Sequence, residues 1–259
     1  MAENSGIEWT HHTANYWIGC TKVQGKGPSA CDHCYAERDW DHRYGRVQWG
    51  PHGDRSGTKH DALRNRLRNW NNKAAAAGER RRVFVNSLSD IADNHKSIQQ
   101  EWRSNAEMDI REFRKLDFLL LTKRPQNIEK LYPEMVSQWP ANAWMGCTVE
   151  NRDEMLRRGD KLAEIGAQTT FWSCEPLLGD LGIIPIEMMP SWIIIGGESG
   201  PNFRKDNPDW YRSIVDQCEA VDVPVLFKQW GGKNQSQIKA LGRALDGVVH
   251  DGYPTPLTA

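Results

Sequence analysis

Short apolar runs recur along the chain and alternate with helix-like segments, and this alternation constrains the fold more than any other feature. Each run is too short for a buried helix and is rich in β-branched or aromatic residues, which is typical of a strand. The runs are almost continuously apolar, as expected for strands covered on both faces. The expected strands are residues 15–20, 82–90, 116–125, 143–151, 169–176, 191–200 and 223–232.

The segments between these runs have the spacing of amphipathic helices. Residues 58–70, for example, place Leu63, Leu67 and Trp70 on one face. Strands that alternate with helices indicate an α/β fold with parallel βα units. Six or seven units predict a parallel (β/α) barrel, most simply a partial one, and a doubly wound open sheet is the alternative. With no fixed repeat or clear linker, residues 1–259 are expected to form a single domain.

The stretch between the first two expected strands, residues 38–82, is longer than an ordinary crossover. It holds twelve Lys or Arg residues against five Asp or Glu, so we treat it as a basic insertion. Trp40, Tyr44, Trp49 and Trp70 are interleaved with these charges. A solvated helical face is one interpretation. The other is a surface for phosphates, with aromatic rings available for bases.

Whole-chain composition is that of an ordinary soluble protein, with a net charge of −1. No apolar run is long enough to span a membrane, and the first residues lack the pattern of a secretory signal. We therefore expect a cytoplasmic protein without membrane contact. In that reducing setting, clustered cysteines are better explained as metal ligands than as disulfides.

Polar residues follow the expected strands repeatedly, and chemistry in a parallel barrel sits at the carboxyl ends of its strands. Six such ends in one chain predict a shared pocket. The residues concerned include Asn86, Ser87, Asp90, Lys123, Glu150, Asn151, Glu175, Glu198 and Lys228.

Three of the six cysteines, Cys20, Cys31 and Cys34, stand in a C-x10-C-x2-C pattern after the first expected strand. We expect Cys20 to end that strand, so that the cysteine loop opens onto the shared pocket. Thiolates suit zinc or iron–sulfur clusters. Zinc would take a fourth ligand from a histidine such as His11, His12 or His33. A cluster held by three cysteines would instead leave one iron open.

A strand followed by a three-cysteine loop ending in C-x2-C-Y-A, and then by a β/α barrel, resembles the radical S-adenosylmethionine superfamily. Within it, the chain is most similar to a radical-SAM-like family of phages and mobile elements that is of unknown function. The matching stretches run from residue 7 to residue 247 and are IEWT, GCTKV, CDHCYAE, VFVNSLSD, LTKRP, SCEPLLG, IIIGGESGP, DQCEAVDVPVLFKQWG and LDG. The first cysteine gap departs from the superfamily's usual three residues.

This resemblance implies that Cys20, Cys31 and Cys34 bind three irons of a [4Fe–4S] cluster. S-adenosylmethionine would bind the fourth iron and be cleaved reductively to a 5′-deoxyadenosyl radical that abstracts a substrate hydrogen. The resemblance assigns Asn86, Ser87 and Asp90 to the methionine amino group, and we expect Lys123 to bind its carboxylate. We expect Glu150 and Asn151 to bind the ribose, and Glu175, Glu198 and Lys228 to face the substrate as catalytic residues.

The expected reaction is of an isomerase or lyase type, with a flavodoxin or ferredoxin as electron donor. Because similar sequences occur in phages and residues 38–82 are basic, our best expectation for the substrate is a nucleic-acid base in DNA or a nucleotide. A hypermodified thymine is one example. The alternative function is a zinc-stabilised nucleic-acid-binding module without catalysis. Carboxylates at the strand ends argue against this alternative because they would repel phosphates.

Overall fold

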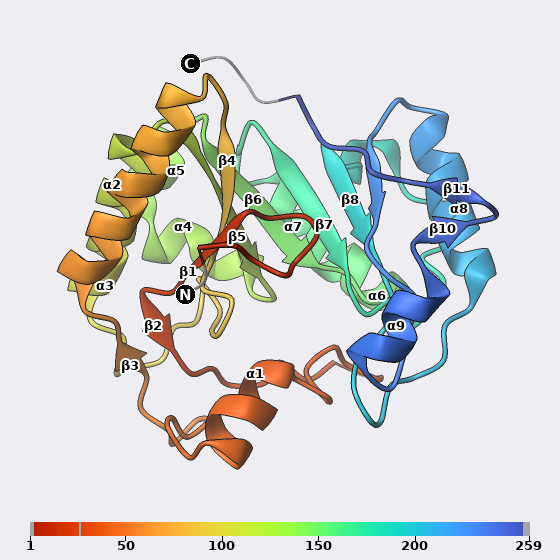
Figure 1. The fold of residues 1–259 in the computed structure, drawn as a ribbon, viewed down its shortest axis with the longest axis horizontal. Helices are drawn as coiled ribbons and strands as arrows, with labels where there is room; N and C mark the ends of the chain where they lie inside the picture. The colour runs from red at the N-terminus through yellow and green to blue at the C-terminus, as the bar shows by residue number, and fades with distance from the viewer. Residues whose placement is uncertain (1–2, 26, 256–259) are drawn as a thin grey trace.

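The computed structural model describes residues 3–25 and 27–255 of the chain, and its centre is a seven-stranded parallel sheet (Figure 1). The strand order β1-β4-β5-β6-β7-β8-β9 follows the chain order, and β1 does not pair with β9. The sheet curls into an open half-barrel, which confirms the predicted partial (β/α) barrel. Its strands are β1 (His12–Ala14), β4 (Arg81–Val85), β5 (Leu116–Thr122), β6 (Ala143–Thr148), β7 (Thr170–Cys174), β8 (Trp192–Ile195) and β9 (Val225–Phe227).

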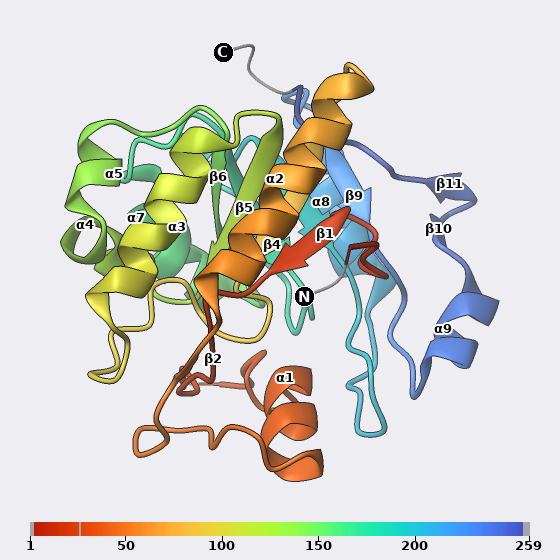
Figure 2. The same cartoon turned by 60° about the vertical axis from the view of Figure 1, so that its left-hand side comes forward.

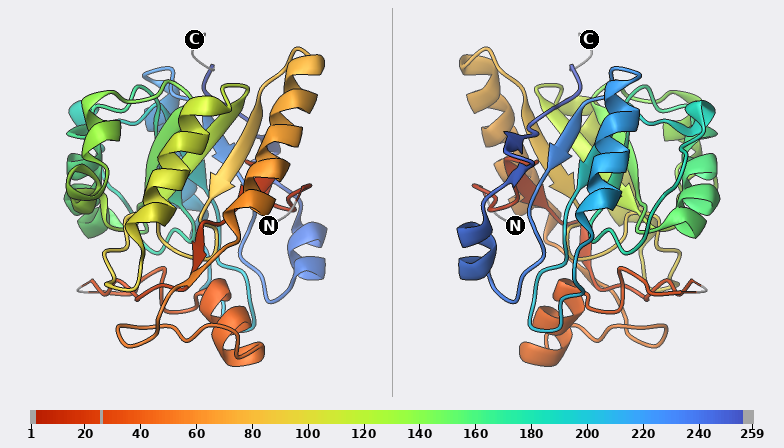
Figure 3. Two further views of the ribbon diagram at one scale, coloured as in Figure 1. Left: turned by 90° about the vertical axis from the view of Figure 1, so that its left-hand side faces the viewer. Right: turned by 90° about the vertical axis from the view of Figure 1, so that its right-hand side faces the viewer.

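Helices cover the outer face of the curled sheet, as the two side views in Figure 3 show. Between the strands lie α2 (His60–Ala76), α3 (Gln100–Glu112), α4 (Ile128–Leu131), α5 (Pro133–Ser137), α6 (Arg152–Glu154), α7 (Asp160–Ala163) and α8 (Pro208–Glu219). Shorter helical turns are η2 (Pro125–Asn127), η3 (Met155–Gly159) and η4 (Ile186–Met188), and α9 (Gln235–Leu241) follows β9. Two-residue strands form two small antiparallel sheets, β2 (Trp17–Ile18) with β3 (Ser56–Gly57) and β10 (Ala244–Leu245) with β11 (Val248–Val249). None of the described helices is both long enough and apolar enough to cross a membrane.

The outer core forms because every strand presents apolar side chains to the helices. Leu63, Leu67 and Trp70 of α2 are almost completely buried against Val83 and Val85 of β4. Figure 2 shows α2 and α3 lying over this part of the sheet. Full burial of side chains of this size stabilises a fold by about 1.5–3 kcal/mol each.

A second apolar cluster fills the inside of the curl, and it contains no helix residue. Phe84, Leu119 and Trp144 lie in one row because β4, β5 and β6 are in register at these positions. Gly146 faces Phe171, and a Cβ at this glycine would lie 2.4 Å from the ring. The glycine therefore lets a large ring fill the concave face.

The first strand is not the one predicted from residues 15–20. The strand that pairs with β4 is His12–Ala14, and Trp17–Ile18 belong instead to the small sheet with β3. The apolar run is explained by Trp17, which is fully buried beneath the guanidinium of Arg103 rather than in the barrel. Cys20 consequently stands on a loop and not at the end of a barrel strand.

The basic stretch 38–82 is only partly an insertion. Its second half is α2, an ordinary crossover helix, followed by the first residues of β4. The additional structure lies earlier and comprises α1 (Tyr35–Glu37), the π-helical turn η1 (Arg38–Arg43) and the loop that leads to β3. In Figures 1 and 2 this segment lies beyond the end of the barrel towards which the β4 arrow points.

Candidate functional site

A cavity of about 330 Å³ opens at the carboxyl ends of the parallel strands. The loop with the three cysteines closes one side of it. The rest is formed by residues at or just after the carboxyl ends of β4 to β9, together with Ile7 and Trp9 from the segment before β1. This arrangement matches the shared pocket predicted from the polar strand ends. Nine of the twelve predicted site residues line the cavity: Cys20, Cys31, Cys34, Ser87, Asp90, Lys123, Glu175, Glu198 and Lys228.

The three cysteines are free thiols and are partly accessible to solvent. Cys20 and Cys34 pack against one small apolar cluster that contains Ala36, Val47 and Trp49. This cluster brings two ends of a long loop together, because apolar burial draws α1 and the Trp49 segment beneath Cys20. The loop therefore reaches the cavity although Cys20 does not end a barrel strand.

Arg124 holds Cys20 from the barrel side. Its Nη1 lies 3.8 Å from the Cys20 sulfur and donates to Asp90 Oδ2 at 2.8 Å. Its Nη2 donates to the carbonyl of Thr21. Arg124 is the second residue after β5, in the sequence TKRP, and so belongs to the polar strand ends expected from the sequence, although no role was predicted for it.

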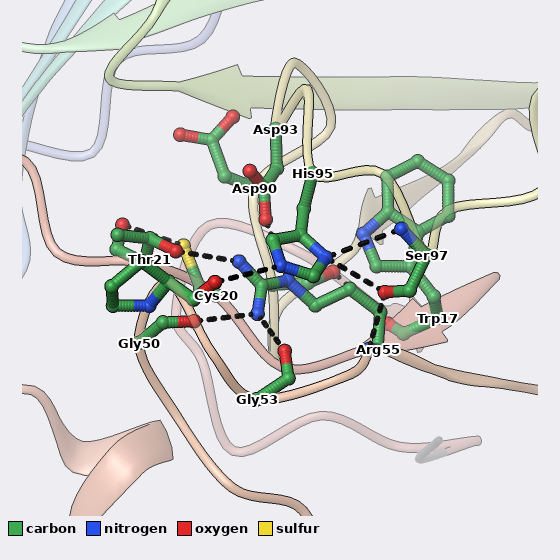
Figure 4. A network of polar contacts seen from close by, with 12 residues as sticks. Trp17, Cys20, Thr21, Gly50, Gly53, Arg55, Asp90, Asp93, His95 and Ser97 are labelled. Carbon is green, nitrogen blue, oxygen red and sulfur yellow. Dashed lines mark hydrogen bonds and ion pairs between the residues drawn. The ribbon is translucent and has the colours of Figure 1, made fainter.

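Arg55 holds the same loop from the other side (Figure 4). Its side chain is fully buried and forms an ion pair with Asp93 at 2.8 Å. It also donates to the hydroxyl of Thr21 at 2.7 Å and to the carbonyls of Gly50 and Gly53. In the sequence, Arg55 is one of many basic residues in the stretch 38–82. Its role in positioning the cysteine loop follows only from contacts with residues that are distant in the sequence.

A third arginine fixes the loop that carries Cys31 and Cys34. Arg204 donates to the carbonyl of Ser29 and forms an ion pair with Asp32, both at 3.1 Å. Glu198 binds Arg204 and also accepts a contact from His33 Nδ1 at 3.1 Å. Burial opposes ionisation of Glu198, but hydrogen bonds from Arg204 and His33 leave its pKa below the ordinary value.

Glu198 therefore has a structural role in addition to the catalytic role predicted from the sequence. Its carboxylate lines the cavity, yet Arg204 and His33 occupy its oxygens and use them to position the cysteine loop. Asp90 is similarly engaged. It accepts hydrogen bonds from the Thr122 hydroxyl at 2.5 Å and the Lys123 backbone N–H at 3.0 Å, besides the bond from Arg124.

Lys123 differs from its neighbours because, in residues 3–25 and 27–255, no carboxylate forms an ion pair with its ammonium group. Burial lowers the pKa of Lys123, but the nearby thiols and Glu150 outweigh this effect and raise it. A cation without a carboxylate partner, directed to a cavity lined by three thiols, suits an anionic group of a ligand.

The environment of the thiols themselves is apolar. Burial raises the pKa of Cys20 to about 12, and Asp90 adds to this effect while Arg124 opposes it. Burial also raises the pKa of Cys34. Thiols of this kind lose their protons on metal binding, and the positive charges of Arg124 and Lys123 then stabilise the thiolates.

The structure does not bring Asn86, Glu150 and Asn151 to the cavity. Asn86 has a positive φ of 57°, which asparagine tolerates, and this turn directs its Oδ1 to the backbone N–H of Tyr16. Asn151 caps α6 by accepting from the N–H of Glu154. The capping bond accounts for Asn151, whereas Nδ2 of Asn86 is buried without a hydrogen-bond partner among the described residues.

Glu150 is completely buried and serves as a further support of the cysteine loop. It forms an ion pair with Arg158 at 2.6 Å and accepts from the backbone N–H of Ala30, next to Cys31, at 3.2 Å. Because a buried carboxylate of this kind is fully partnered, it has no free oxygen directed to a ribose.

The opposite wall of the cavity holds an ion pair beside apolar rings. Lys228 Nζ lies 2.8 Å from Glu175 Oε2, and Glu175 Oε1 accepts from the indole N–H of Trp9 at 3.1 Å. Trp9 packs on Phe84, with ring centroids 4.7 Å apart. Sequence analysis identified Glu175 and Lys228 but missed Trp9, which lies far from both in the sequence.

The described residues contain no group of three or more His, Cys, Asp or Glu side chains that could hold one metal ion. Of the three histidines that could complete a zinc site, His11 and His12 do not line the cavity, whereas His33 lines it and contacts Glu198. Each cysteine of an iron–sulfur cluster binds a different iron, so cluster ligands stand further apart than the ligands of a single ion. Three thiols around one cavity, with Arg124 and Lys123 nearby, are donors that an iron–sulfur cluster could use.

Comparisons with known proteins give one family and a distant structural likeness. No curated protein matches the chain significantly. A double mutant of spore photoproduct lyase with bound AdoMet and dinucleoside spore photoproduct aligns at 13% identity with a TM-score of 0.44, covering 82% of this chain and 52% of that one. A single mutant of the same lyase aligns at 14% identity with a TM-score of 0.42, covering 78% and 59%. The chain thus spans only 52–59% of the length of these solved structures.

The sequence family that matches extends over residues 4–254, which is nearly the whole chain. It includes the cysteine loop, all seven strands of the half-barrel and every residue of the cavity wall. The chain belongs to the family described as "Protein of unknown function (DUF5131)".

Proposed function

We propose that this protein is a radical S-adenosylmethionine enzyme that acts on a nucleic-acid base. The observation that carries the proposal is the convergence of Cys20, Cys31 and Cys34 on one cavity that also holds the unpaired Lys123. The half-barrel places this cavity at the carboxyl ends of its strands, where parallel barrels carry their chemistry.

Cys20, Cys31 and Cys34 would hold a [4Fe–4S] cluster, with Arg124 beside the Cys20 sulfur. Such a cluster, when bound, would supply the electron for reductive cleavage of S-adenosylmethionine and so the radical chemistry that takes a hydrogen atom from the substrate. Three arginines, Arg55, Arg124 and Arg204, hold the cysteine loop in place. The thiols are therefore already positioned before the metal binds. An electron donor such as a flavodoxin or ferredoxin is required.

Lys123 would bind the carboxylate of the methionine moiety. Lys123 follows β5 directly, and its ammonium group is near the thiols of Cys31 and Cys34 and near Glu150, which is itself paired with Arg158. The lysine therefore remains available for an anion from outside the chain. Ser87, which follows β4, lines the same side of the cavity and offers a hydroxyl to the cofactor.

The substrate would occupy the side of the cavity formed by Trp9, Phe84, Glu175 and Lys228. Trp9 and Phe84 offer an apolar wall of two rings tilted by 55° to each other, and a planar base could stack on one of them, which is favourable for every base. Glu175 and Lys228 offer an acceptor and a donor to the polar edge of that base. A thymine or a modified thymine matches this chemistry, and a base in duplex DNA would first have to leave the stack.

Anaerobic reconstitution with iron and sulfide tests the proposal. We expect a brown protein with about four irons per chain, which releases 5′-deoxyadenosine from S-adenosylmethionine when a reductant is added. Incubation with oligonucleotides whose thymine carries deuterium then identifies the substrate, because the abstracted deuterium appears in 5′-deoxyadenosine. A colourless protein that binds one zinc ion after the same treatment would overturn the proposal and favour the zinc-stabilised module.

A further inference from the structure

One exposed surface of the additional segment combines unpaired positive charge with aromatic rings, and it lies next to the cavity. We call it the η1 patch and define it as Trp40, Arg43, Tyr44 and Arg46. The guanidinium carbon of Arg46 lies 5.3 Å from the ring centroids of both Trp40 and Tyr44. The guanidinium of Arg43 lies 5.2 Å from the Tyr44 ring. Tyr44 remains 50% exposed, so its ring is accessible to a ligand.

The charges of the η1 patch are not used within the chain. Among the described residues, no carboxylate forms an ion pair with Arg43 or Arg46. The two acidic residues of the same turn have other partners. Asp39 binds Arg38 at 3.1 Å, and Asp41 accepts from the backbone N–H of Trp49 at 2.7 Å.

Other arginines of the basic stretch 38–82 are committed to the barrel. Arg55 pairs with Asp93, Arg64 with Asp109, Arg80 with Asp117 and Arg81 with Glu79. Two of the four aromatic residues of the stretch, Trp49 and Trp70, are buried. Arg66 and Arg68 of α2 are exposed and have no carboxylate partner among the described residues, but Trp70, the aromatic residue of that helix, is buried. The η1 patch is therefore the part of the stretch where unpaired arginines lie beside an exposed aromatic ring.

The position of the η1 patch connects it with the cavity. Trp40 packs against the apolar cluster that also receives Cys20 and Cys34. Tyr35, one turn earlier, lines the cavity and donates its hydroxyl hydrogen to the Ser87 carbonyl at 2.6 Å. A chain that lay on the patch could therefore place one of its units in the cavity.

We propose that the η1 patch binds a single-stranded stretch of nucleic acid whose reacting base enters the cavity. Arg43 and Arg46 contact backbone phosphates, and the half-exposed ring of Tyr44 stacks on a base that flanks the reacting one. A single strand is favoured over a duplex because stacking on Tyr44 needs an unpaired base. The proposal rests on the proposed function for the identity of the reacting base, but the binding step requires neither cluster nor cofactor.

The test is fluorescence anisotropy of a labelled twelve-nucleotide oligothymidine with the full-length protein. We expect Arg43→Gln combined with Arg46→Gln to weaken binding by about tenfold or more, and Tyr44→Ala to weaken it by about tenfold. The plot of log affinity against log salt should become less steep by roughly 0.7 for each phosphate that the variant no longer neutralises. The matched control is Arg66→Gln combined with Arg68→Gln, which removes the same charge from the exposed face of α2 and should leave affinity unchanged.

Equal weakening in the patch and control variants, or no weakening in either, overturns the proposal, because the charge of the whole chain would then explain binding. Tighter binding of a duplex that is insensitive to Tyr44→Ala also overturns it. Unchanged thermal unfolding of the patch variants excludes misfolding as the cause of weaker binding. Cleavage of S-adenosylmethionine by a protein that binds no oligonucleotide would reject the η1 patch alone, whereas binding without cleavage would reject the enzyme alone.

Discussion

Arg124 Nη1 lies 3.8 Å from the sulfur of Cys20 and 2.8 Å from Asp90 Oδ2. The Arg124 guanidinium thus contacts both the Cys20 thiol, a proposed metal ligand, and the carboxylate of Asp90, which follows β4. Because its side chain is only 10% exposed, water does not replace these contacts readily. The arrangement makes Arg124 the link between the cysteine loop and the barrel.

Replacing Arg124 by leucine should destabilise the protein even without metal. The change leaves Asp90 buried without its cation, and breaking such a pair from one side costs about 3–5 kcal/mol. Urea denaturation of the metal-free protein measures this loss. Adding Asp90→Asn to Arg124→Leu should recover part of it, since the buried charge is then gone. A single variant as stable as wild type would show that the pair is not important for the fold.

Substitution of a cysteine in the cavity should lower the iron content of the reconstituted protein, whereas substitution of a cysteine in the core should not. Cys31→Ala and Cys34→Ala are each expected to lower the iron content after reconstitution and to abolish release of 5′-deoxyadenosine. Cys218→Ala is the control, because this cysteine is buried in α8 outside the cavity. Iron analysis and chromatography of the cofactor products give the two readouts. Full cleavage activity in either cavity variant would contradict the ligand assignment.

The fold was readable from the sequence wherever strands are buried on both faces. The runs that became β4 to β9 are continuous in apolar residues, because helices cover one side and the inner cluster fills the other. β1 was missed because His12, Thr13 and Ala14 carry no apolar signal. The neighbouring run with Trp17 does carry one, but its burial comes from packing outside the barrel.

Most residues that line the cavity could be predicted from the sequence, but the residues that hold the cysteine loop in place could not. Cysteine spacing and polar strand ends identified most of the lining. The residues that hold the loop could not be identified in this way, because their partners lie far away in the sequence. Arg204, for instance, contacts Asp32 across 172 positions. Asn86 and Glu150 looked like ligands for the opposite reason, since buried structural hydrogen bonds also require polar residues at strand ends.

Lys123 should affect the binding of S-adenosylmethionine more than the binding of iron. Lys123→Met removes the unpaired cation, and loss of a charged hydrogen bond should weaken cofactor binding by about 1.5–3 kcal/mol. Equilibrium binding to the reconstituted protein, together with iron analysis, measures both effects. Lys22→Met is a matched control, because Lys22 also lines the cavity but already pairs with Glu37 at 2.7 Å. An equal loss of affinity in the two variants would contradict a specific role for Lys123.

Glu198 should make the protein less stable as the pH falls below the ordinary pKa of a glutamate. Its pKa in the folded state lies below the ordinary value of 4.5, because hydrogen bonds from Arg204 and His33 outweigh the effect of burial. The ionised carboxylate therefore stabilises the folded state above pH 4.5, and this contribution is lost as the pH falls through the lowered pKa. Glu198→Gln removes the contribution at every pH.

The difference in melting temperature between wild type and Glu198→Gln should hence be constant near neutral pH and shrink below pH 4.5. Thermal unfolding followed by circular dichroism in a series of buffers measures it. Glu187→Gln is the control, since Glu187 is exposed and no ion pair of the described residues involves it. A difference that stays constant down to the acid transition would mean that Glu198 acts through packing alone. The Arg204 contact would then not be what holds the cysteine loop against the barrel.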